Sequence, residues 1–528
     1  MRDNQYPGRS VVMSTRGMIA ASQPLATQAG FAVLQAGGNA MDAAIAASAV
    51  LCVAEPQATG IGGDCFLLYH EAKTGKLHGL NGSGRAPVRA TLEEFERRGL
   101  MQVPEFGILS VIVPGAVDAW QTALERFGTR SLEELLQPAI AYAEDGYAVT
   151  PVVAKAWHNN AAVLAPHAES RRDFLVDGRA PAAGTVHRQP RLAQSLRQLA
   201  RAGRDAFYQG AIAEEIVRFS HVHDGLLELE DFAAYRAEWV EPICTDYRGV
   251  RVYEIPPNGQ GITALMTLNI LAHADLRGMA HLSADHLHLF IEAFKLATAE
   301  RDEYVADPAF NKLPVEAMLS KAFAAKQYAR IDPQRAARFP IPPAARTHRD
   351  TVYLSVVDRD RNAVSFINSL YYPFGSGMVA GDTGIMLQNR GAGFVLERGH
   401  FNCIAPRKRP LHTIIPAMAY RGDDLLSFGV MGGEYQPMGH VYVLTNWLDF
   451  GMDLQEAIDA PRFLPGGGAV ALERPIPDAV LKALQQRGHA VGRTELALGG
   501  AQAIYVDTRN GVLSAGSDPR KDGCALGY

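Results

Sequence analysis

Short blocks of apolar and polar residues alternate along the N-terminal part of the chain, and they predict strands interleaved with helices. GMIAAS, residues 17–22, has the apolar run that is typical of a buried strand. From residue 25 to residue 35 the apolar positions recur at helical spacing, and a pair of glycines follows that is typical of a helix end. We therefore expect a strand followed by a helix in this segment.

A second helix is predicted directly after those glycines, over NAMDAAIAASAVLCV, residues 39–53. Asn39 is a predicted N-cap, and Asp42 stands three residues later, as in a capping box. The helix has almost no polar face, and an apolar surface on every side is unfavourable in water. We expect it to lie buried, packed against a sheet.

The glycine-rich turn TGIGGD, residues 59–64, is followed by the strand-like CFLLYH, residues 65–70. A phosphate-binding loop needs a strand before the glycines and a helix after them. Because the order here is helix, turn and strand, the turn does not indicate nucleotide binding. Close packing of the backbone is the better explanation for its glycines.

Residues 104–312 are mostly helical in pattern, with two strand-like stretches inside VEPICTDYRGVRVYEIPP, residues 240–257. From Met318 the helical pattern is expected to dissolve towards FPIPPAARTHRD, residues 339–350, where prolines remove helix donors. TVYLSVVDRDRNAVSFINSL, residues 351–370, then has the strand, polar turn and strand of a hairpin.

The last part of the chain alternates again between strand and helix. Strands are predicted over HTIIPAMAY and DLLSFGVMGG, residues 412–420 and 424–433. Helices are predicted over residues 439–451 and 453–461, and AIYVDTRNGVLSAGSDPR, residues 503–520, has the pattern of a closing hairpin.

Composition narrows the choice of function class. The 528 residues are 48% hydrophobic and 20% charged with a net charge of -5, which is typical of a soluble globular protein. No long basic run is present, so we expect no nucleic-acid partner. The N-terminus lacks the apolar stretch of a signal peptide, and no segment has the roughly 18 apolar residues of a membrane span. We expect a cytoplasmic protein without a membrane partner.

Cysteine and histidine spacing predicts no metal and no other cofactor. The five cysteines are odd in number and far apart, unlike a disulfide framework or a CxxC metal site: Cys52, Cys65, Cys244, Cys403 and Cys524. His286, His288 and Glu292 share one predicted helix, and two more histidines, at 221 and 223, share a predicted loop. Neither group has the H-E-x-x-H spacing of a zinc site, so we interpret both as structural.

Several motifs in one order resemble the small subunit of the γ-glutamyltransferase-like family. They begin at Thr351 with TVYLSVVD and continue through FGSGMVAGDTGIMLQN, KRPLHTIIP, MGG and SDPR. Earlier in the chain, ASQPLAT, GGNAMDAAIA, GIGGD, GSGRAP, PPNGQGI and ERDEYVADP resemble the large subunit of the same family. The resemblance covers nearly the whole chain.

This resemblance implies an α+β fold, the four-layer αββα sandwich of N-terminal-nucleophile hydrolases. It also implies a proenzyme that cuts itself, here between Asp350 and Thr351. The products would be a large subunit, residues 1–350, and a small subunit, residues 351–528. We expect these two chains to stay associated in one αββα unit. The oligomeric state is open, with a dimer of such two-chain units as one candidate.

Thr351 would then be both the nucleophile and the source of its own base. A threonine hydroxyl is a weak nucleophile that needs an adjacent base. The α-amine released by cleavage has a reference pKa of roughly 7.7 to 8.0, so a useful fraction is neutral near physiological pH. A free N-terminal threonine therefore needs no histidine or carboxylate relay.

Three further positions match the family's catalytic groups. The paired glycines that stabilise the oxyanion match Gly432 and Gly433, although a Gly-Gly turn after a strand is also common without any such role. The position that matches Ser369 holds threonine in γ-glutamyltransferases and supports the nucleophile by hydrogen bonding. Serine keeps that hydroxyl.

The substrate pocket departs from γ-glutamyltransferases. An asparagine, a glutamine and an aspartate of that pocket match Tyr371, Arg390 and Gly393 here, so the acid that binds the substrate amine is missing. A cationic amine would lose its charge-assisted hydrogen bond. The guanidinium of Arg390 could bind a carboxylate bidentately, and Tyr371 would shorten the pocket. A surface salt bridge is the alternative role for Arg390.

Two more pocket positions are altered. The arginine with which the family grips the substrate carboxylate matches Ser83, and Arg85 is displaced from it by two residues. A serine pair near the oxyanion site matches His412 and Thr413. We include Arg85, His412 and Thr413 among the expected substrate-binding residues.

A short pocket with an arginine suits a small anionic amide, and the pattern most resembles the family's oxamate amidohydrolases. We therefore expect hydrolysis of oxamate to oxalate and ammonia, a reaction of purine-ring degradation. γ-Glutamyl transfer, glutathione hydrolysis and removal of a glutaryl-type side chain keep the same mechanism and stay open.

Two rival classes of function are weaker. A binding module that keeps the fold would never cut itself, and Thr351, Ser369 and the glycine pair would be idle in it. An ordinary serine hydrolase would need a G-x-S-x-G elbow between a strand and a helix. The sequence has no such elbow in that setting.

Overall fold

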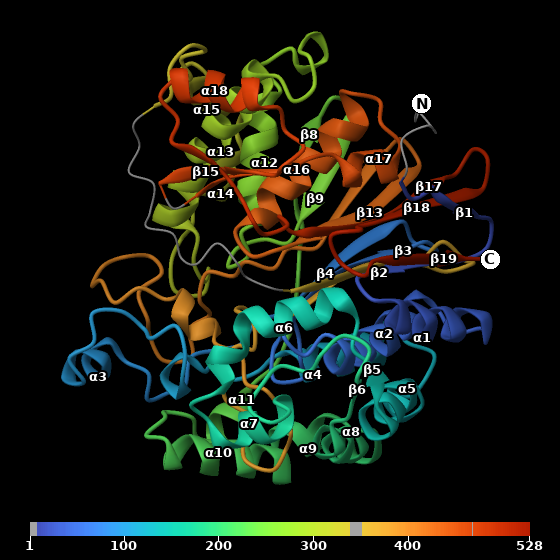
Figure 1. Cartoon of the computed structure of the whole chain (residues 1–528), viewed down its shortest axis with the longest axis vertical. Helices are drawn as coiled ribbons and strands as arrows, with labels where there is room; N and C mark the ends of the chain where they lie inside the picture. Colours follow the sequence, from blue (N-terminus) through green and yellow to red (C-terminus); the bar gives the residue numbers. More distant parts are fainter. Residues whose placement is uncertain (1–7, 338–350, 467) are drawn as a thin grey trace.

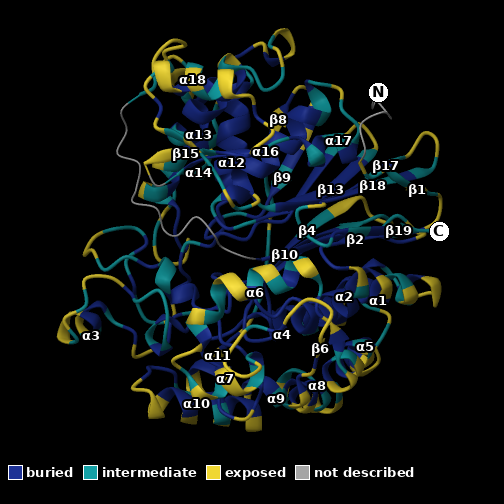
Figure 2. Ribbon diagram, viewed as in Figure 1, coloured by how far each residue is buried: buried dark blue, intermediate teal, exposed yellow. Residues whose placement is uncertain are grey.

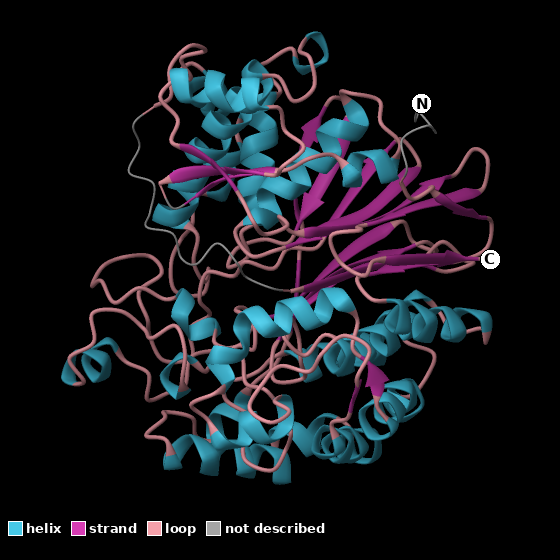
Figure 3. Cartoon of the chain, viewed as in Figure 1, coloured by secondary structure: helices cyan, strands magenta, loops and turns pink. Residues whose placement is uncertain are grey.

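A computed structural model describes residues 8–337, 351–466 and 468–528 of the chain. Two antiparallel sheets of seven strands each lie face to face, and helices cover both outer faces (Figures 1 and 3). This is the predicted αββα sandwich. The predicted cleavage residue Asp350 lies outside the described residues.

The two large sheets are built from strands of distant parts of the chain. The first sheet has the order β1 (Val12–Ser14), β18 (Val512–Ser517), β17 (Gly500–Asp507), β13 (Asp424–Met431), β12 (Ala417–Arg421), β9 (Val250–Glu254) and β8 (Ile243–Tyr247). The second has the order β19 (Cys524–Gly527), β2 (Met18–Ala21), β10 (Val352–Val357), β11 (Ala363–Ser369), β3 (Asp64–Glu71), β4 (Lys76–Gly82) and β7 (Glu238–Val240).

The second sheet is covered by helices from the first half of the chain. They share one apolar core with its strands: α1 (Pro24–Gln35), α2 (Ala40–Ala54), α4 (Ala116–Phe127), α5 (Leu132–Asp145), α6 (Pro151–Leu164), α7 (Ala168–Phe174), α8 (Pro190–Ala202), α9 (Arg204–Tyr208), α10 (Ala211–Val222) and α11 (Leu229–Ala234). α3 (Leu92–Arg97) packs in a small cluster at the periphery.

The first sheet is covered by later helices, in the upper part of Figure 1. These are α12 (Gly261–Leu271), α13 (Ala284–Tyr304), α14 (Val315–Leu319), α15 (Lys321–Tyr328), α16 (Tyr435–Leu448), α17 (Leu454–Asp459) and α18 (Asp478–Gln486). A three-stranded sheet lies among them, made of β14 (Phe463–Gly466), β15 (Ala469–Leu472) and β16 (Val491–Arg493). The strands β5 (Tyr147–Ala148) and β6 (Val186–His187) pair on the other side of the molecule.

A separate apolar core fills the space between the two large sheets. Phe66, Tyr353, Met418 and Ile504 are fully buried there, and they come from strands of both sheets. Burial of apolar side chains on both sides of each sheet is what holds four layers together.

The expected buried helix is confirmed as α2. Every residue of α2 is buried, and it lies beneath the second sheet (Figure 2). The Asn39 side chain accepts from the Asp42 backbone N–H at 3.0 Å, and the Asp42 carboxylate accepts from the Asn39 N–H at 2.9 Å. The predicted capping box therefore sets where this helix begins.

The predicted hairpin is confirmed as β10 and β11, which pair antiparallel with Val352 opposite Asn368. It lies between β2 and β3, so strands from before and after Thr351 pair with one another in one sheet. Close backbone packing is also confirmed for the TGIGGD turn. A Cβ on Gly62 would lie 2.3 Å from the Met386 carbonyl oxygen, which leaves no room for a side chain.

Several predicted boundaries are wrong. The helical pattern does not dissolve at Met318, because the Ser320 side chain accepts from the Phe323 N–H at 3.2 Å and caps α15. The helix predicted from residue 439 begins at Tyr435, and only Glu434 separates it from the glycine pair. The strand predicted from residue 412 begins at Ala417, and His412 and Thr413 instead contact Asp64 and Arg390.

Within the described ranges, no helix combines the length and the apolar character that a bilayer span requires.

Candidate active site

The Thr351 and Ser369 hydroxyls meet at one end of the hairpin. Their Oγ atoms lie 3.0 Å apart, and both residues are buried. Thr351 precedes β10 and Ser369 ends β11, so the antiparallel pairing of the two strands brings them together. The structure thus joins two residues that the sequence predicted to work together.

A tight turn after β11 fixes the Ser369 hydroxyl. Its Oγ accepts a hydrogen bond from the Tyr371 backbone N–H at 2.9 Å. Tyr371 has a φ of 85°, in the left-handed region that bulky residues rarely adopt. Such backbone strain persists only where the surroundings impose it, and it is frequent at functional sites.

The predicted oxyanion glycines lie between β13 and α16. Gly432 has a φ of 124° and Gly433 a φ of 59°, conformations that favour glycine. The carbonyl oxygens of Gly432 and Gly433 accept from the Tyr435 and Gln436 N–H groups at 3.1 and 3.2 Å. The pair therefore stands at the N-terminus of α16, where the helix dipole favours negative charge.

Asp64, at the start of β3, is the centre of a buried polar cluster. Its Oδ2 accepts from His412 Nε2 at 3.0 Å and lies 3.4 Å from Arg390 Nε. Its Oδ1 accepts from the Gly84 N–H at 2.8 Å. Because Asp64 pairs with Ser369 in the sheet, this cluster lies directly beside the end of β11.

Burial and the neighbouring Arg390 lower the pKa of His412 to about 4, so its ring is neutral at physiological pH. The hydrogen bonds agree with one tautomer. Nε2 donates to Asp64, and Nδ1 accepts from the Ile414 N–H at 3.3 Å. Arg390 Nε is the other partner of Asp64 in the cluster, at 3.4 Å.

Arg390 is held in one orientation and is fully buried. Its Nη1 donates to Thr413 Oγ1 at 2.8 Å, and its guanidinium carbon lies 4.0 Å from the centre of the Tyr371 ring. The alternative of a surface salt bridge is wrong, since neither Arg390 nor Asp64 is exposed. Three predicted substrate-binding residues, Arg390, Tyr371 and Thr413, thus lie together.

Gln260 and Arg301 also belong to the site, although sequence reasoning assigned no role to either residue. Gln260 Nε2 donates to the carbonyl oxygens of Gly433 at 3.0 Å and Thr413 at 2.8 Å. Its Oε1 accepts from Arg301 Nη1 at 2.7 Å, and Arg301 also pairs with Glu434. Both residues belong to motifs that carried the family resemblance, PPNGQGI and ERDEYVADP, which is the signal that could have found them.

The Arg85 side chain makes its contacts with residues outside the Asp64 cluster. Its Nη1 donates to the Arg407 carbonyl oxygen at 2.9 Å, and its Nη2 pairs with Glu238. It lines a surface cavity of about 220 Å³ together with Tyr235 and Glu238. Ser83, two residues earlier, accepts from Asn258 Nδ2 at 3.0 Å. The substrate-binding role of Arg85 stays a prediction.

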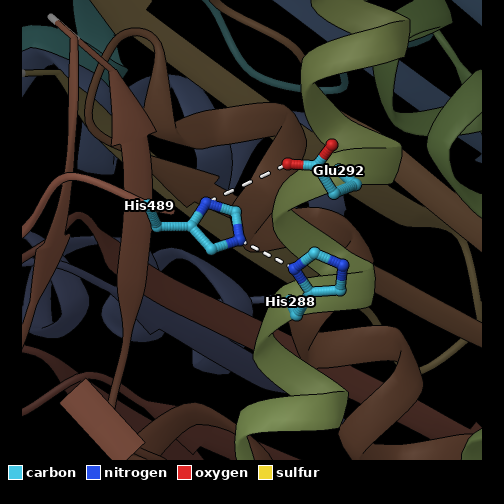
Figure 4. Close-up of side chains that lie close together, drawn as sticks. All are labelled: His288, Glu292 and His489. Carbon is cyan, nitrogen blue, oxygen red and sulfur yellow. Dashed lines mark hydrogen bonds and ion pairs between the residues drawn. The ribbon is translucent and has the colours of Figure 1, made fainter. Parts of the chain in front are cut away.

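A second polar cluster brings together residues able to ligate a metal, as Figure 4 shows for His288, Glu292 and His489. His288 Nδ1 and His489 Nε2 lie 2.7 Å apart, closer than two ligands of one zinc ion usually lie. The Lys295 ammonium donates to Glu292 Oε1 at 2.8 Å. A metal here would have to displace these bonds.

In the sequence His288 and Glu292 share a predicted helix with His286. In the structure the third member of their cluster is His489, not His286. His286 Nδ1 instead accepts from the Leu282 N–H at 3.1 Å and its ring packs on Phe290.

Comparisons with known proteins find relatives along nearly the whole chain. The family model described as gamma-glutamyltranspeptidase matches residues 26–528. The glutathione hydrolase-like YwrD proenzyme of Bacillus subtilis is 40% identical over 98% of this chain and 99% of its own length. The oxamate amidohydrolase proenzyme of Klebsiella pneumoniae is 36% identical over 98% of this chain and 99% of its own length.

Among solved structures, the cephalosporin acylase from Bacillus halodurans superposes on the chain with a TM-score of 0.92. It is 43% identical in sequence, and the alignment covers 100% of this chain and 99% of the acylase.

Proposed function

The chain belongs to the gamma-glutamyltranspeptidase family, and on that premise we propose that it is a proenzyme that cuts itself before Thr351 and then hydrolyses amides with Thr351 as the nucleophile. The contact of 3.0 Å between the Thr351 and Ser369 hydroxyls is the observation that carries this proposal. It gives the nucleophile a fixed partner at the end of a buried hairpin.

Self-cleavage starts from the Thr351 hydroxyl oxygen, which attacks the carbonyl carbon of Asp350. The peptide bond breaks as the acyl group moves from nitrogen to oxygen, so an ester forms and the Thr351 amine is released. Water then hydrolyses the ester. The large chain ends in the Asp350 carboxylate, and Thr351 keeps its hydroxyl and gains an α-amine that acts as its base.

Turnover repeats the same chemistry on an external amide. The α-amine takes the hydroxyl proton while the Thr351 oxygen attacks the amide carbonyl. Gly432 and Gly433, which precede α16, would donate their N–H groups to the oxyanion, and one such donor is typically worth about 10² to 10³ in rate. The leaving nitrogen takes the proton, and water hydrolyses the acyl ester.

The substrate proposed is a small carboxylated amide, with oxamate as the first choice. Asp64 and Thr413 hold the guanidinium of Arg390 against Tyr371, so a carboxylate that enters beside Tyr371 meets a cation fixed in position. Oxamate carries a carboxylate bonded directly to a primary amide, and its hydrolysis gives oxalate and ammonia. Similarity to an oxamate amidohydrolase supports this choice.

A larger amide is the second candidate. Likeness to a glutathione hydrolase-like protein and to a cephalosporin acylase favours an acyl group longer than oxalate. Against a γ-glutamyl group stands Gly393, which offers no carboxylate to the substrate amine at the matching position.

A denaturing gel followed by a substrate panel tests the proposal. Purified protein should give two bands, one near two-thirds and one near one-third of full length. The panel compares ammonia release from oxamate with turnover of a γ-glutamyl anilide and of a glutaryl amide. Turnover of the anilide without ammonia release from oxamate would show that the substrate is a γ-glutamyl amide and not oxamate. A single uncut, inactive chain would contradict the mechanism.

A further inference from the structure

Tyr353 stands two residues after the proposed nucleophile and is fully buried between the two large sheets. Its hydroxyl is hydrogen-bonded to Ser355 Oγ at 2.8 Å and to Ser365 Oγ at 2.7 Å. Because the hydroxyl has two partners, loss of either serine alone leaves it bonded to the other. No step of the proposed mechanism uses this tyrosine.

The Tyr353 ring fills the place where a side chain would stand at Gly429, on β13 of the opposite sheet. A Cβ on Gly429 would lie 2.3 Å from Tyr353 Cε2 and 2.6 Å from both Cδ2 and Cζ. Glycine inside a strand weakens the strand and often marks such a close approach. The tyrosine that packs against this strand therefore explains the glycine at position 429.

Two contacts set how β10 and β13 lie across the sandwich. Ser355 Oγ and Ser427 Oγ are 2.9 Å apart, and Tyr353 packs on Gly429. Side chains on one face of a strand recur at every second residue. A step of two residues along β10 is therefore matched by a step of two residues in the opposite direction along β13.

One more step of this register reaches the candidate active site. Two residues before Tyr353 stands Thr351, and two residues after Gly429 stands Met431, which directly precedes Gly432. The register thus brings the nucleophile opposite the end of the strand from which the oxyanion turn starts. The tyrosine contact is the neighbouring contact between the same two strands.

Self-cleavage would make Thr351 the end of a chain. β10 pairs with β11 from Val352 onward, whereas among the described residues its pairing with β2 starts only at Leu354. Chain ends are poorly ordered unless other contacts hold them. The Tyr353 side chain supplies such a contact, because it ties this end of β10 to β13.

We propose that Tyr353 is a positioning residue, which holds the cleaved Thr351 in line with the oxyanion turn through its contact with Gly429. The inference rests on the proposed function, in which the nucleophile and the oxyanion donors act on one amide. Self-cleavage attacks a carbonyl that the chain itself tethers to Thr351, so it depends little on the spacing between the sheets. Turnover needs both strands aligned around an external amide, and a misplacement of about 1 Å can cost about 10²-fold in rate. Loss of the contact should therefore slow turnover far more than self-cleavage.

Two variants test the two sides of this contact. Gly429→Ala must displace the Tyr353 ring, and we expect kcat to fall about 10²-fold. Tyr353→Phe keeps the ring and removes its hydroxyl, and we expect kcat to fall about 3- to 10-fold, as for a lost hydrogen bond. In both variants KM and the rate of self-cleavage should change less than about threefold. Turnover is measured on the best amide of the substrate panel, and cleavage is followed on gels.

Tyr247→Phe and Gly516→Ala are the matched controls. Tyr247 is a fully buried tyrosine of β8 whose hydroxyl donates to Asp449 at 2.7 Å. Gly516 is a buried glycine of β18, and a Cβ there would lie 2.8 Å from Ile458 Cδ1. Both controls should cost stability and keep kcat.

Wild-type kcat in Gly429→Ala would overturn the positioning role, and wild-type kcat in Tyr353→Phe would do so if Gly429→Ala fails to fold. In either case the parent is cut and active, so the proposed function would stand. Equal slowing of self-cleavage and turnover, or an equal loss of kcat in the controls, would also overturn the role. A parent that is neither cut nor active would overturn the proposed function and this inference together.

Discussion

Gln260 Nε2 donates a hydrogen bond of 3.0 Å to the carbonyl oxygen of Gly433 and so ties the predicted oxyanion turn to the start of α12, which Gln260 precedes. Arg301 Nη1 donates a hydrogen bond of 2.7 Å to Gln260 Oε1, the other polar atom of the same amide. Gln260 is a positioning residue on this view, since it acts through Gly433.

Gln260→Glu keeps an acceptor for Arg301 but sets a carboxylate against the Gly433 carbonyl oxygen. We expect kcat to fall about 10- to 100-fold with KM changed less than about threefold, because an oxyanion turn acts in the transition state. Gln189→Glu is the matched control, since the buried Gln189 also donates to a backbone carbonyl, that of Val53, at 2.8 Å. An equal loss of kcat in both variants would contradict a positioning role.

Ser369→Ala removes the hydroxyl beside Thr351 and leaves the Tyr371 N–H without its acceptor. We expect both self-cleavage and kcat to slow by about 10- to 100-fold, which corresponds to one hydrogen bond to a developing charge. Ser365→Ala is the control, because Ser365 is a buried serine four residues earlier on β11. Cleavage time courses on gels measure the effect. Unchanged cleavage in Ser369→Ala would contradict the role of that hydroxyl.

Gly432→Ala tests the oxyanion turn itself. The new Cβ would lie 2.9 Å from the Gly499 Cα at a φ of 124°, so the turn must shift. We expect kcat to fall about 10²- to 10³-fold. Gly422→Ala has a φ of 61° with open space around the new Cβ, and it should cost stability while kcat is kept. Wild-type kcat in Gly432→Ala would contradict the oxyanion role.

The His288, Glu292 and His489 cluster predicts a loss of stability in acid. Burial and Lys295 lower the pKa of His489 to about 3, and burial lowers that of His288. Below pH 6.5 these two histidines bind protons in the unfolded chain but stay neutral in the folded chain. Stability present above pH 6.5 is therefore lost as the pH falls towards 3.

Urea unfolding at pH 7 and pH 5 measures this, on the uncut Thr351→Ala chain so that one chain unfolds. From pH 7 to pH 5 the free energy of unfolding should fall by about 1 to 2 kcal/mol less in His489→Gln than in its parent. His221→Gln, at a half-exposed histidine, is the control. An equal loss in all three chains would contradict a contribution from His489.

Local sequence patterns predict much of the fold but few of the contacts between residues of the site. The capping box of Asn39 and Asp42 and the hairpin from Thr351 depend on neighbours in the chain, so spacing alone reveals them. The contact of Asp64 with Arg390 joins residues 326 positions apart. No local pattern encodes such a contact, because folding of both sheets creates it.

The family resemblance identified more residues of the site than local sequence patterns did. It named Thr351, Ser369 and Arg390, which the structure brings to one end of the hairpin. It did not identify Asp64, which pairs with Ser369 in the sheet and contacts Arg390. His489 was missed because it comes from a loop far from α13 in the sequence. Spatial neighbours of this kind follow only from the packed layers.

The most direct test of the central claim is the intact mass of the parent beside Thr351→Ala and Thr351→Ser. We predict that the parent gives two chains, the smaller beginning at Thr351. Thr351→Ser should also be cut, because it keeps the hydroxyl, and Thr351→Ala should remain a single chain of 57.1 kDa with no amidase activity. Cleavage of Thr351→Ala at the same bond would contradict Thr351 as the nucleophile.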